Sequence, residues 1–252
     1  MSIRSLAVSA QCPGVVYAGT KDPAAVYASE DGGRHWEERT AFRRARRWYW
    51  CSPAEKPFTP YVLALALSPA DSNLILAGIE VGAVLRSSDG GQSWSGHRGG
   101  ADRDCHQLHF HPRQPNWAYQ AGGGGPAVSR DGGITWRKHR SGLEGHYTWN
   151  VACDPQQPEI WYAVTAPFFK AHSTNAQAAL YRHAGAAPWQ KLAGGLPPSW
   201  PALPVLAAHP NAAGHLYLAT RQGALWHSQD YGDSWHLLPP TIGPVWFQLL
   251  VL

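Results

Sequence analysis

The sequence has few charged residues and almost no methionine: Asp, Glu, Lys and Arg make up 15% of its 252 residues, and there is one Met. It also lacks a long apolar run. No stretch approaches the roughly 18 residues of a membrane-spanning helix, and the N-terminus has no apolar segment followed by a cleavage site. We therefore expect a cytoplasmic protein with no membrane partner, or a secreted one if a leader has been removed.

Cysteine and net charge are also limited. The cysteines Cys12, Cys51, Cys105 and Cys153 have no short paired spacing of the kind found in zinc or redox sites. We expect free thiols, no metal and no cofactor. The net charge is only +4, and four arginines are confined to one local run, so nucleic-acid binding is not predicted.

Turn-forming and aromatic residues are abundant instead. The chain contains 26 Gly, 21 Pro and 13 Trp, and 44% of its residues are hydrophobic. This composition favours many short strands joined by turns over helices, and it is sufficient to bury a large core. The sequence therefore predicts an all-β fold in a single domain, residues 1–252.

One octapeptide, with the pattern Ser-x-Asp-x-Gly-x-x-Trp, recurs along the chain. Full copies occupy residues 29–36, 87–94, 129–136 and 228–235. A damaged copy at 182–189 keeps Gly185 and Trp189 but has Ala184 at the Asp position. Asp supplies an acceptor for turn amides, and the Gly that follows it tolerates positive φ, so each copy is predicted to form a hairpin turn.

This pattern resembles the Asp box, the repeat of bacterial neuraminidases, sortilin-type receptors and many bacterial proteins. The resemblance implies a β-propeller with one box per blade, on the turn between the third and fourth strands, and it implies that the box is structural and not catalytic. The structural residues are then the Asp and Trp of each full copy: Asp31, Trp36, Asp89, Trp94, Asp131, Trp136, Asp230 and Trp235.

Two strands precede each box and at least one follows it, which makes a four-stranded antiparallel unit of the size of one propeller blade. We therefore expect a β-propeller of five such blades plus a C-terminal extra strand at residues 245–252. That strand either closes the ring against the first blade or begins another blade. The longest gap between boxes contains an Arg-rich, aromatic insertion at residues 42–50.

Propellers bind ligands at the mouth of the central channel, where opening strands and inter-blade loops meet. We predict that Glu80, Asp104, His106, Trp149 and Arg221 converge there as a ligand-binding site. The insertion adds a second group of candidates, Arg47, Trp48 and Trp50, because guanidinium and indole groups suit sugars and phosphates. His106, His109 and His111 are interpreted as channel-lining or turn-capping residues in preference to metal ligands.

Two functions from different classes fit these residues. The first is a non-catalytic propeller that binds a glycan or protein ligand, as a monomer. The alternative is a glycoside hydrolase, which needs two opposed carboxylates; Glu80, Asp102, Asp104 and Glu144 are the candidates. The arginine clamp, activated Tyr and acid Asp of a sialidase cannot be located. The sequence leaves open whether the protein is an enzyme.

Overall fold

The computed structural model describes residues 1–53, 56–169, 175–239, 242–245, 249 and 251. The expected C-terminal strand at 245–252 falls largely outside these residues. The chain forms two compact units: residues 1–122 with 127–138, and residues 123–126 with 139–252. No helix among the described residues is long and apolar enough to cross a membrane.

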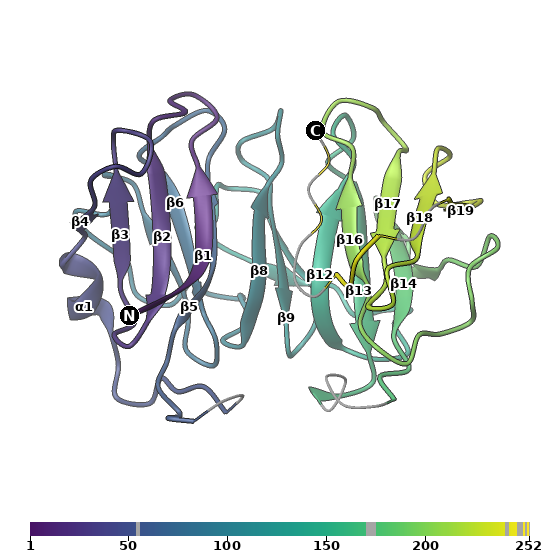
Figure 1. The fold of residues 1–252 in the computed structure, drawn as a ribbon, viewed down its shortest axis with the longest axis horizontal. Helices are drawn as coiled ribbons and strands as arrows, with labels where there is room; N and C mark the ends of the chain where they lie inside the picture. Colours follow the sequence, from purple (N-terminus) through teal and green to yellow (C-terminus); the bar gives the residue numbers. More distant parts are fainter. Residues whose placement is uncertain (54–55, 170–174, 240–241, 246–248, 250, 252) are drawn as a thin grey trace. The chain divides into compact units, whose positions relative to one another are not determined.

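The first unit contains three antiparallel sheets, whose strands are labelled in Figure 1 where there is room. Their strands are β1 (Ser2–Val8), β2 (Val16–Lys21), β3 (Val26–Ser29) and β4 (Glu37–Glu38) in blade one; β5 (Val62–Leu67), β6 (Ile75–Ile79) and β7 (Val84–Ser87) in blade two; and β8 (Cys105–Phe110), β9 (Ala118–Gly122), β10 (Ala127–Ser129) and β11 (Arg137–Lys138) in blade three. The short helix α1 (Ala41–Ala45) lies between blades one and two.

The second unit contains two four-stranded antiparallel sheets. Their strands are β12 (Tyr147–Cys153), β13 (Ile160–Ala166), β14 (Ala179–Ala184) and β15 (Gln190–Lys191) in blade four; and β16 (Val205–Ala208), β17 (Leu216–Ala219), β18 (Leu225–Ser228) and β19 (His236–Leu238) in blade five. The prediction of five antiparallel blades, each with its box after the third strand, is confirmed.

Blade two departs from the expected four strands, because its fourth segment is not a strand. Side chains accept the hydrogen bonds that backbone carbonyls would accept in a ladder: Arg86 N donates to Ser95 Oγ at 3.0 Å and Val84 N donates to His97 Nδ1 at 3.1 Å. Ser95 N still donates to Arg86 O at 2.9 Å. The segment therefore covers the edge of the sheet without adopting regular strand geometry.

Within each unit the opening strands of successive blades lie side by side. β5 contacts both β1 and β8, and β12 contacts β16. This adjacency is the one that lines the axis of a propeller. The buried core lies between the blades; its largest fully buried side chains include Trp161, Tyr119 and Tyr162.

Four opening strands carry a β-bulge at the same place. The pairing register shifts near the start of β1, β5, β8 and β12, which leaves Arg4, Leu63, His106 and Trp149 as the extra residues. The bulge also changes the side-chain alternation in blade three. Cys105 lies in the core cluster with Leu108 and Phe110, whereas strict alternation along the strand would place it on the opposite face.

The full boxes form the predicted turns. In blade two, Ser87 Oγ accepts from Gly91 N at 2.8 Å and donates to Asp89 Oδ1 at 2.8 Å, while Trp94 Nε1 donates to Gly91 O at 3.1 Å. Asp89 Oδ1 also accepts from Ser93 N at 2.9 Å. The Gly91 amide is buried but the Ser93 amide faces water, so Ser is the acceptor that protects the turn interior.

This difference gives a test of the box. Ser87→Ala is expected to lower the free energy of unfolding by about 1 to 3 kcal/mol, because it leaves a buried N–H without an acceptor. Asp89→Ala is expected to cost less, since water can replace the carboxylate at an exposed amide. Urea denaturation of the two variants measures the ranking, and a larger loss for Asp89→Ala would contradict it.

The damaged box of blade four is stabilised by a different network. In blade four His183 pairs with Trp161, and in blade two the box serine Ser87 pairs with Ile75 at the equivalent place. His183 therefore stands at the serine position, and this turn is one residue shorter than the sequence count suggested. Trp161 Nε1 donates to His183 Nδ1 at 3.1 Å, and His183 Nε2 lies 3.1 Å from His139 Nδ1. The buried imidazole of His183 therefore stands at the serine position and ties this turn to Trp161 and to the half-buried His139.

Candidate functional site

Each blade has one end at which its opening strand begins and its second strand finishes; we call this the entry end. Glu80 follows β6 in blade two and Arg221 follows β17 in blade five. In the strand register both are equivalent to Lys21, which ends β2 in blade one. Asp104 and His106 lie at the start of β8, and Trp149 lies near the start of β12. The structure thus places the five predicted residues at the entry ends of their own blades.

Glu80 belongs to a polar cluster in the first unit. Its side chain is buried, and its Oε2 accepts from Ser52 Oγ at 2.6 Å. The bridge between Lys21 and Tyr61 lies next to it, since Glu80 N donates to Tyr61 O at 3.2 Å. The Arg4 guanidinium and the Lys21 ammonium lie 5.1 and 5.5 Å from the Tyr61 ring centroid. Acidic, basic and aromatic groups therefore meet at one end of blades one and two.

The other candidate carboxylates of this unit have structural partners. Asp104 Oδ1 lies 3.4 Å from His106 Nε2, whose imidazole is almost fully buried. Asp102 caps a turn: its Oδ1 accepts from Asp104 N at 3.0 Å, and its Oδ2 lies 2.5 Å from Lys138 Nζ. Paired and capping carboxylates hold loops in place, which is a different task from general acid or base chemistry.

The insertion candidates separate into buried and exposed residues. Trp50 is buried in the core of the first unit, with its ring 6.2 Å from that of Phe42. Arg47 is exposed and Trp48 is 94% exposed, and the Trp48 ring lies edge-on to Tyr49 at 5.9 Å. Tyr49 accepts from Arg103 Nη1 at 3.2 Å, which ties the insertion to the entry end of blade three.

The turn-capping interpretation holds for His111, which directly follows β8. His111 is fully buried, and its Nδ1 accepts from the backbone N–H groups of Arg113 and Gln114 at 3.1 and 3.0 Å. It therefore caps the β8–β9 turn, as expected. No group of three His, Cys, Asp or Glu residues among the described parts of the chain is arranged to hold a metal ion.

A pocket of about 330 Å³ lies at the entry end of blade four. Glu144 and Lys191 form an ion pair at 2.8 Å within its wall, and Tyr181, Gln177 and Thr165 also line it. Lys191 holds the pKa of Glu144 below its usual value, and burial together with the Glu144 carboxylate raises the pKa of Tyr181 to about 12. The pocket thus presents a carboxylate, an ammonium, a neutral phenol and an amide at pH 7.

Unusual backbone conformations occur at three of these ends. Positive φ is rare for residues other than glycine, and among the described residues it is found at Asp22, Val81 and Gln177 with φ of 55°, 44° and 48°, and at Tyr231 with φ of 61°. The first three lie in connections between the second and third strands of a blade, whereas Tyr231 lies in the box turn of blade five. Strained residues often concentrate at functional sites, and three of these four lie at entry ends.

Tyr181, Lys191 and Gln177 were not predicted from the sequence. They lie on or beside the outer strands β14 and β15 of the damaged repeat, where no motif points to a site. The sequence signal at this place is the long connection between β13 and β14, whose described residues Pro167 and Gln177 line the pocket.

Comparison with known proteins supports the fold. The BNR/Asp-box repeat family matches residues 127–138, which span the box of blade three. The crystal structure of an ancestral GH74 enzyme is similar with a TM-score of 0.68 and 18% identity, over 93% of this chain and 32% of that chain. The GH74 enzyme of Niastella koreensis is similar with a TM-score of 0.69 and 14% identity, over 94% of this chain and 38% of that chain.

A weaker match is the structure of YCF48 bound to D1 peptide, with a TM-score of 0.47 and 17% identity over 94% of this chain and 81% of that chain. The comparison with curated proteins found no match. This chain spans about a third of the length of the two GH74 enzymes. The repeated turns and the blade topology, together with the repeat-family match and the two GH74 folds, are those of a β-propeller built on Asp-box repeats.

Proposed function

We propose that this chain is a non-catalytic propeller that binds a glycan at the entry ends of its blades. The observation that carries the proposal is the pocket of blade four, whose ion pair, phenol and amide offer both donors and acceptors to a hydroxyl-rich ligand. The polar and aromatic cluster around Tyr61 and Glu80 offers similar chemistry at the entry ends of blades one and two.

The chemistry of the pocket favours binding over hydrolysis. A glycosidase needs two carboxylates about 5 to 10 Å apart across the scissile bond. Among the described lining residues, Glu144 is the only carboxylate, and it is paired with Lys191. A Tyr nucleophile would need a lowered pKa, whereas the pKa of Tyr181 is raised to about 12. The described lining residues therefore include neither an activated nucleophile nor a second carboxylate.

The proposal is tested by a printed glycan array probed with the full chain, followed by titration calorimetry with the strongest hit. Tyr181→Phe keeps the ring and removes one hydroxyl, so the affinity is expected to fall by about two-fold to ten-fold, the value of one hydrogen bond. Gln190→Ala is the matched control, because Gln190 lies beside Lys191 on β15 but does not line the pocket.

A parallel assay with 4-nitrophenyl glycosides and soluble polysaccharides tests the alternative function, a glycoside hydrolase. Release of nitrophenol or of reducing ends that is lost in Glu144→Gln would establish a glycoside hydrolase and overturn the non-catalytic assignment. An array without any hit would contradict glycan binding altogether.

A further inference from the structure

The insertion at residues 42–50 is fixed in the first unit at both of its ends. Phe42 on α1 is fully buried and Trp50 is 4% exposed, and both belong to the core cluster of blades one and two. The Phe42 ring lies edge-on to the Trp94 ring at 5.4 Å. Trp50 N donates to Arg47 O at 3.1 Å, which closes a turn at the end of the insertion. The residues between these two anchors are therefore presented by a defined backbone.

Between the anchors, the insertion exposes both charge and aromatic surface. The four arginines of residues 43–47 are exposed, Trp48 is 94% exposed and Tyr49 is 43% exposed. Such exposure is unusual for tryptophan, because its large ring gains more than most side chains from leaving water. We call the set of Arg44, Arg46, Arg47, Trp48 and Tyr49 the Trp48 patch. The patch combines aromatic rings with basic side chains at one place in the chain.

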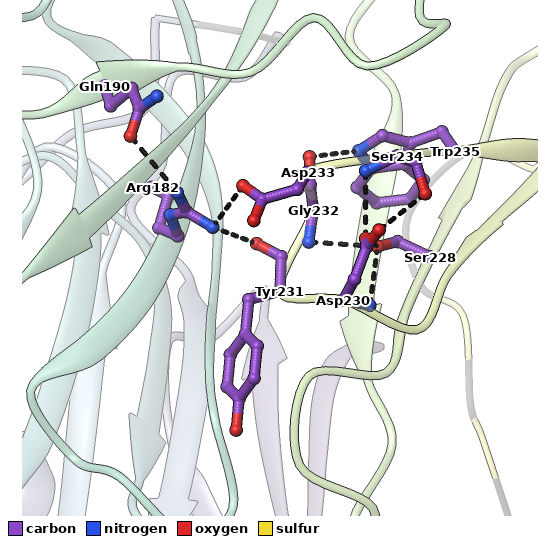
Figure 2. Close-up of polar contacts among 9 residues, drawn as sticks. All are labelled: Arg182, Gln190, Ser228, Asp230, Tyr231, Gly232, Asp233, Ser234 and Trp235. Carbon is purple, nitrogen blue, oxygen red and sulfur yellow. Dashed lines mark hydrogen bonds and ion pairs between the residues drawn. The ribbon is translucent and has the colours of Figure 1, made fainter.

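An arginine that stabilises the fold of this protein has acceptors within its own unit, as Arg182 of blade four shows (Figure 2). Its Nη1 donates to Tyr231 O at 3.0 Å and to Asp233 Oδ1 at 2.8 Å, both in blade five. Its Nη2 donates to Gln190 Oε1 at 3.1 Å. A carbonyl, a carboxylate and an amide therefore hold this guanidinium between two blades.

Three arginines of the insertion lack partners of this kind. Arg43 is paired, since its Nη2 donates to Glu38 Oε2 at 2.7 Å. Within the part of the chain that the structure describes, no carboxylate pairs with Arg44, Arg46 or Arg47. Arg47 Nη1 lies 3.5 Å from the carbonyl oxygens of Arg44 and Arg46, the outer limit of a hydrogen bond. The surface complementary to the patch is therefore anionic.

We propose that the Trp48 patch docks the protein on a membrane surface rich in anionic lipids. The rings of Trp48 and Tyr49 enter the interfacial layer, where these two residue types are enriched in membrane proteins. The three arginines contact the headgroup phosphates, and each positive charge near such a surface strengthens binding by about five-fold. An apolar group or a basic cluster alone gives only weak binding, so the presence of both in one patch carries the inference.

The shape of the patch favours a membrane over a soluble polyanion. A site for a discrete ligand is concave and surrounds most of that ligand, whereas a side chain that is 94% exposed has almost no protein around it. A bilayer interface is fluid and closes around a projecting ring. This inference replaces the expectation of no membrane partner, which considered only spanning segments; a protein that lies on a membrane needs none.

The experiment is co-sedimentation of the full chain with vesicles of phosphatidylcholine alone and of phosphatidylcholine mixed with phosphatidylglycerol. Binding is expected only with phosphatidylglycerol, and it weakens as salt is raised, because salt screens the arginine charges. Arg46→Gln is expected to lower the partition coefficient about five-fold, and adding Arg47→Gln lowers it by about the same factor again. Trp48→Ala is expected to lower it about ten-fold or more, because it removes the ring that enters the interface.

Two matched controls separate the patch from the overall positive charge. Arg113→Gln removes an exposed arginine from the turn after β8, at the opposite end of blade three from its entry end. Trp36→Ala removes a tryptophan that is 39% exposed in the box of blade one. Both variants are expected to bind vesicles as the unmodified chain does, and circular dichroism establishes that every variant is folded.

An unmodified chain that does not bind phosphatidylglycerol vesicles at low salt overturns the proposal. Equal losses in Arg46→Gln and Arg113→Gln also overturn it, since net charge would then account for the attraction. Binding to heparin that depends on the Trp48 patch, without binding to vesicles, overturns it in favour of a soluble polyanion. The proposed glycan binding is tested separately, because the described lining residues of its pocket lie outside the insertion.

Discussion

Truncating Trp136 to alanine is expected to lower the free energy of unfolding by about 3 to 5 kcal/mol, because it removes a large side chain from a packed core and leaves a cavity. Trp136 is 6% exposed and lies in the core cluster between blades two and three with Leu76 and Phe110. Its Nε1 also donates to Gly133 O at 3.2 Å. The loss therefore combines packing with a buried hydrogen bond.

The matched control is Trp36→Ala, at the same position in the box of blade one. Because Trp36 is 39% exposed, its truncation removes less buried area, and the expected loss is about 1 kcal/mol. Urea denaturation followed by circular dichroism measures both changes. Equal losses at the two positions would mean that the box Trp acts within its own turn and not through the neighbouring blade.

Gly78→Ala is expected to destabilise the first unit by about 1 to 3 kcal/mol through overpacking. Gly78 lies on β6 where the opening strand of blade three approaches, and an added Cβ would overlap Cys105 Sγ. It would also lie 3.0 Å from Cys105 Cβ and 3.2 Å from Ala64 Cβ. Both neighbours lie on strands, so neither can move aside without disturbing a sheet.

A double-mutant cycle separates this contact from a general effect of the substitution. Cys105→Ala removes the sulfur that the new methyl group would meet, so Gly78→Ala should cost less in the Cys105→Ala background than in the unmodified chain. The coupling is read from the midpoints of urea denaturation of the four proteins. Independent effects of the two substitutions would contradict a direct clash.

The repeat made the fold predictable from the sequence, but the site only partly so. An Asp-Gly turn followed by a tryptophan predicts a local hairpin. Because this hairpin recurs five times at similar spacing, the repeat predicts the four-stranded blade and the number of blades. The position of Glu80 and Arg221 at equivalent turns followed from the same periodicity. The burial of individual side chains could not be predicted from the sequence. Trp50 belongs to an Arg-rich insertion, yet its ring packs on Phe42 in the core.

The pocket of blade four was beyond the reach of the sequence for another reason. Glu144, Tyr181 and Lys191 come from a loop and two outer strands, and nothing in their spacing indicates that they meet. The damaged box misled in a similar way, because a register one residue shorter puts His183 where serine stands elsewhere. The pocket and the shortened turn both depend on contacts between strands, which the sequence of one strand does not specify.

The repeated bulge at the start of the opening strands keeps one backbone geometry while its side chain differs from blade to blade. The same backbone irregularity holds a guanidinium at Arg4, an alkyl chain at Leu63, an imidazole at His106 and an indole at Trp149. Its geometry is therefore indifferent to the side chain, while the box hydrogen bonds lie elsewhere in each blade. A combinatorial library randomised at Arg4, Leu63 and Trp149, which are not buried, would vary the chemistry of these strand ends without altering the residues that define the scaffold.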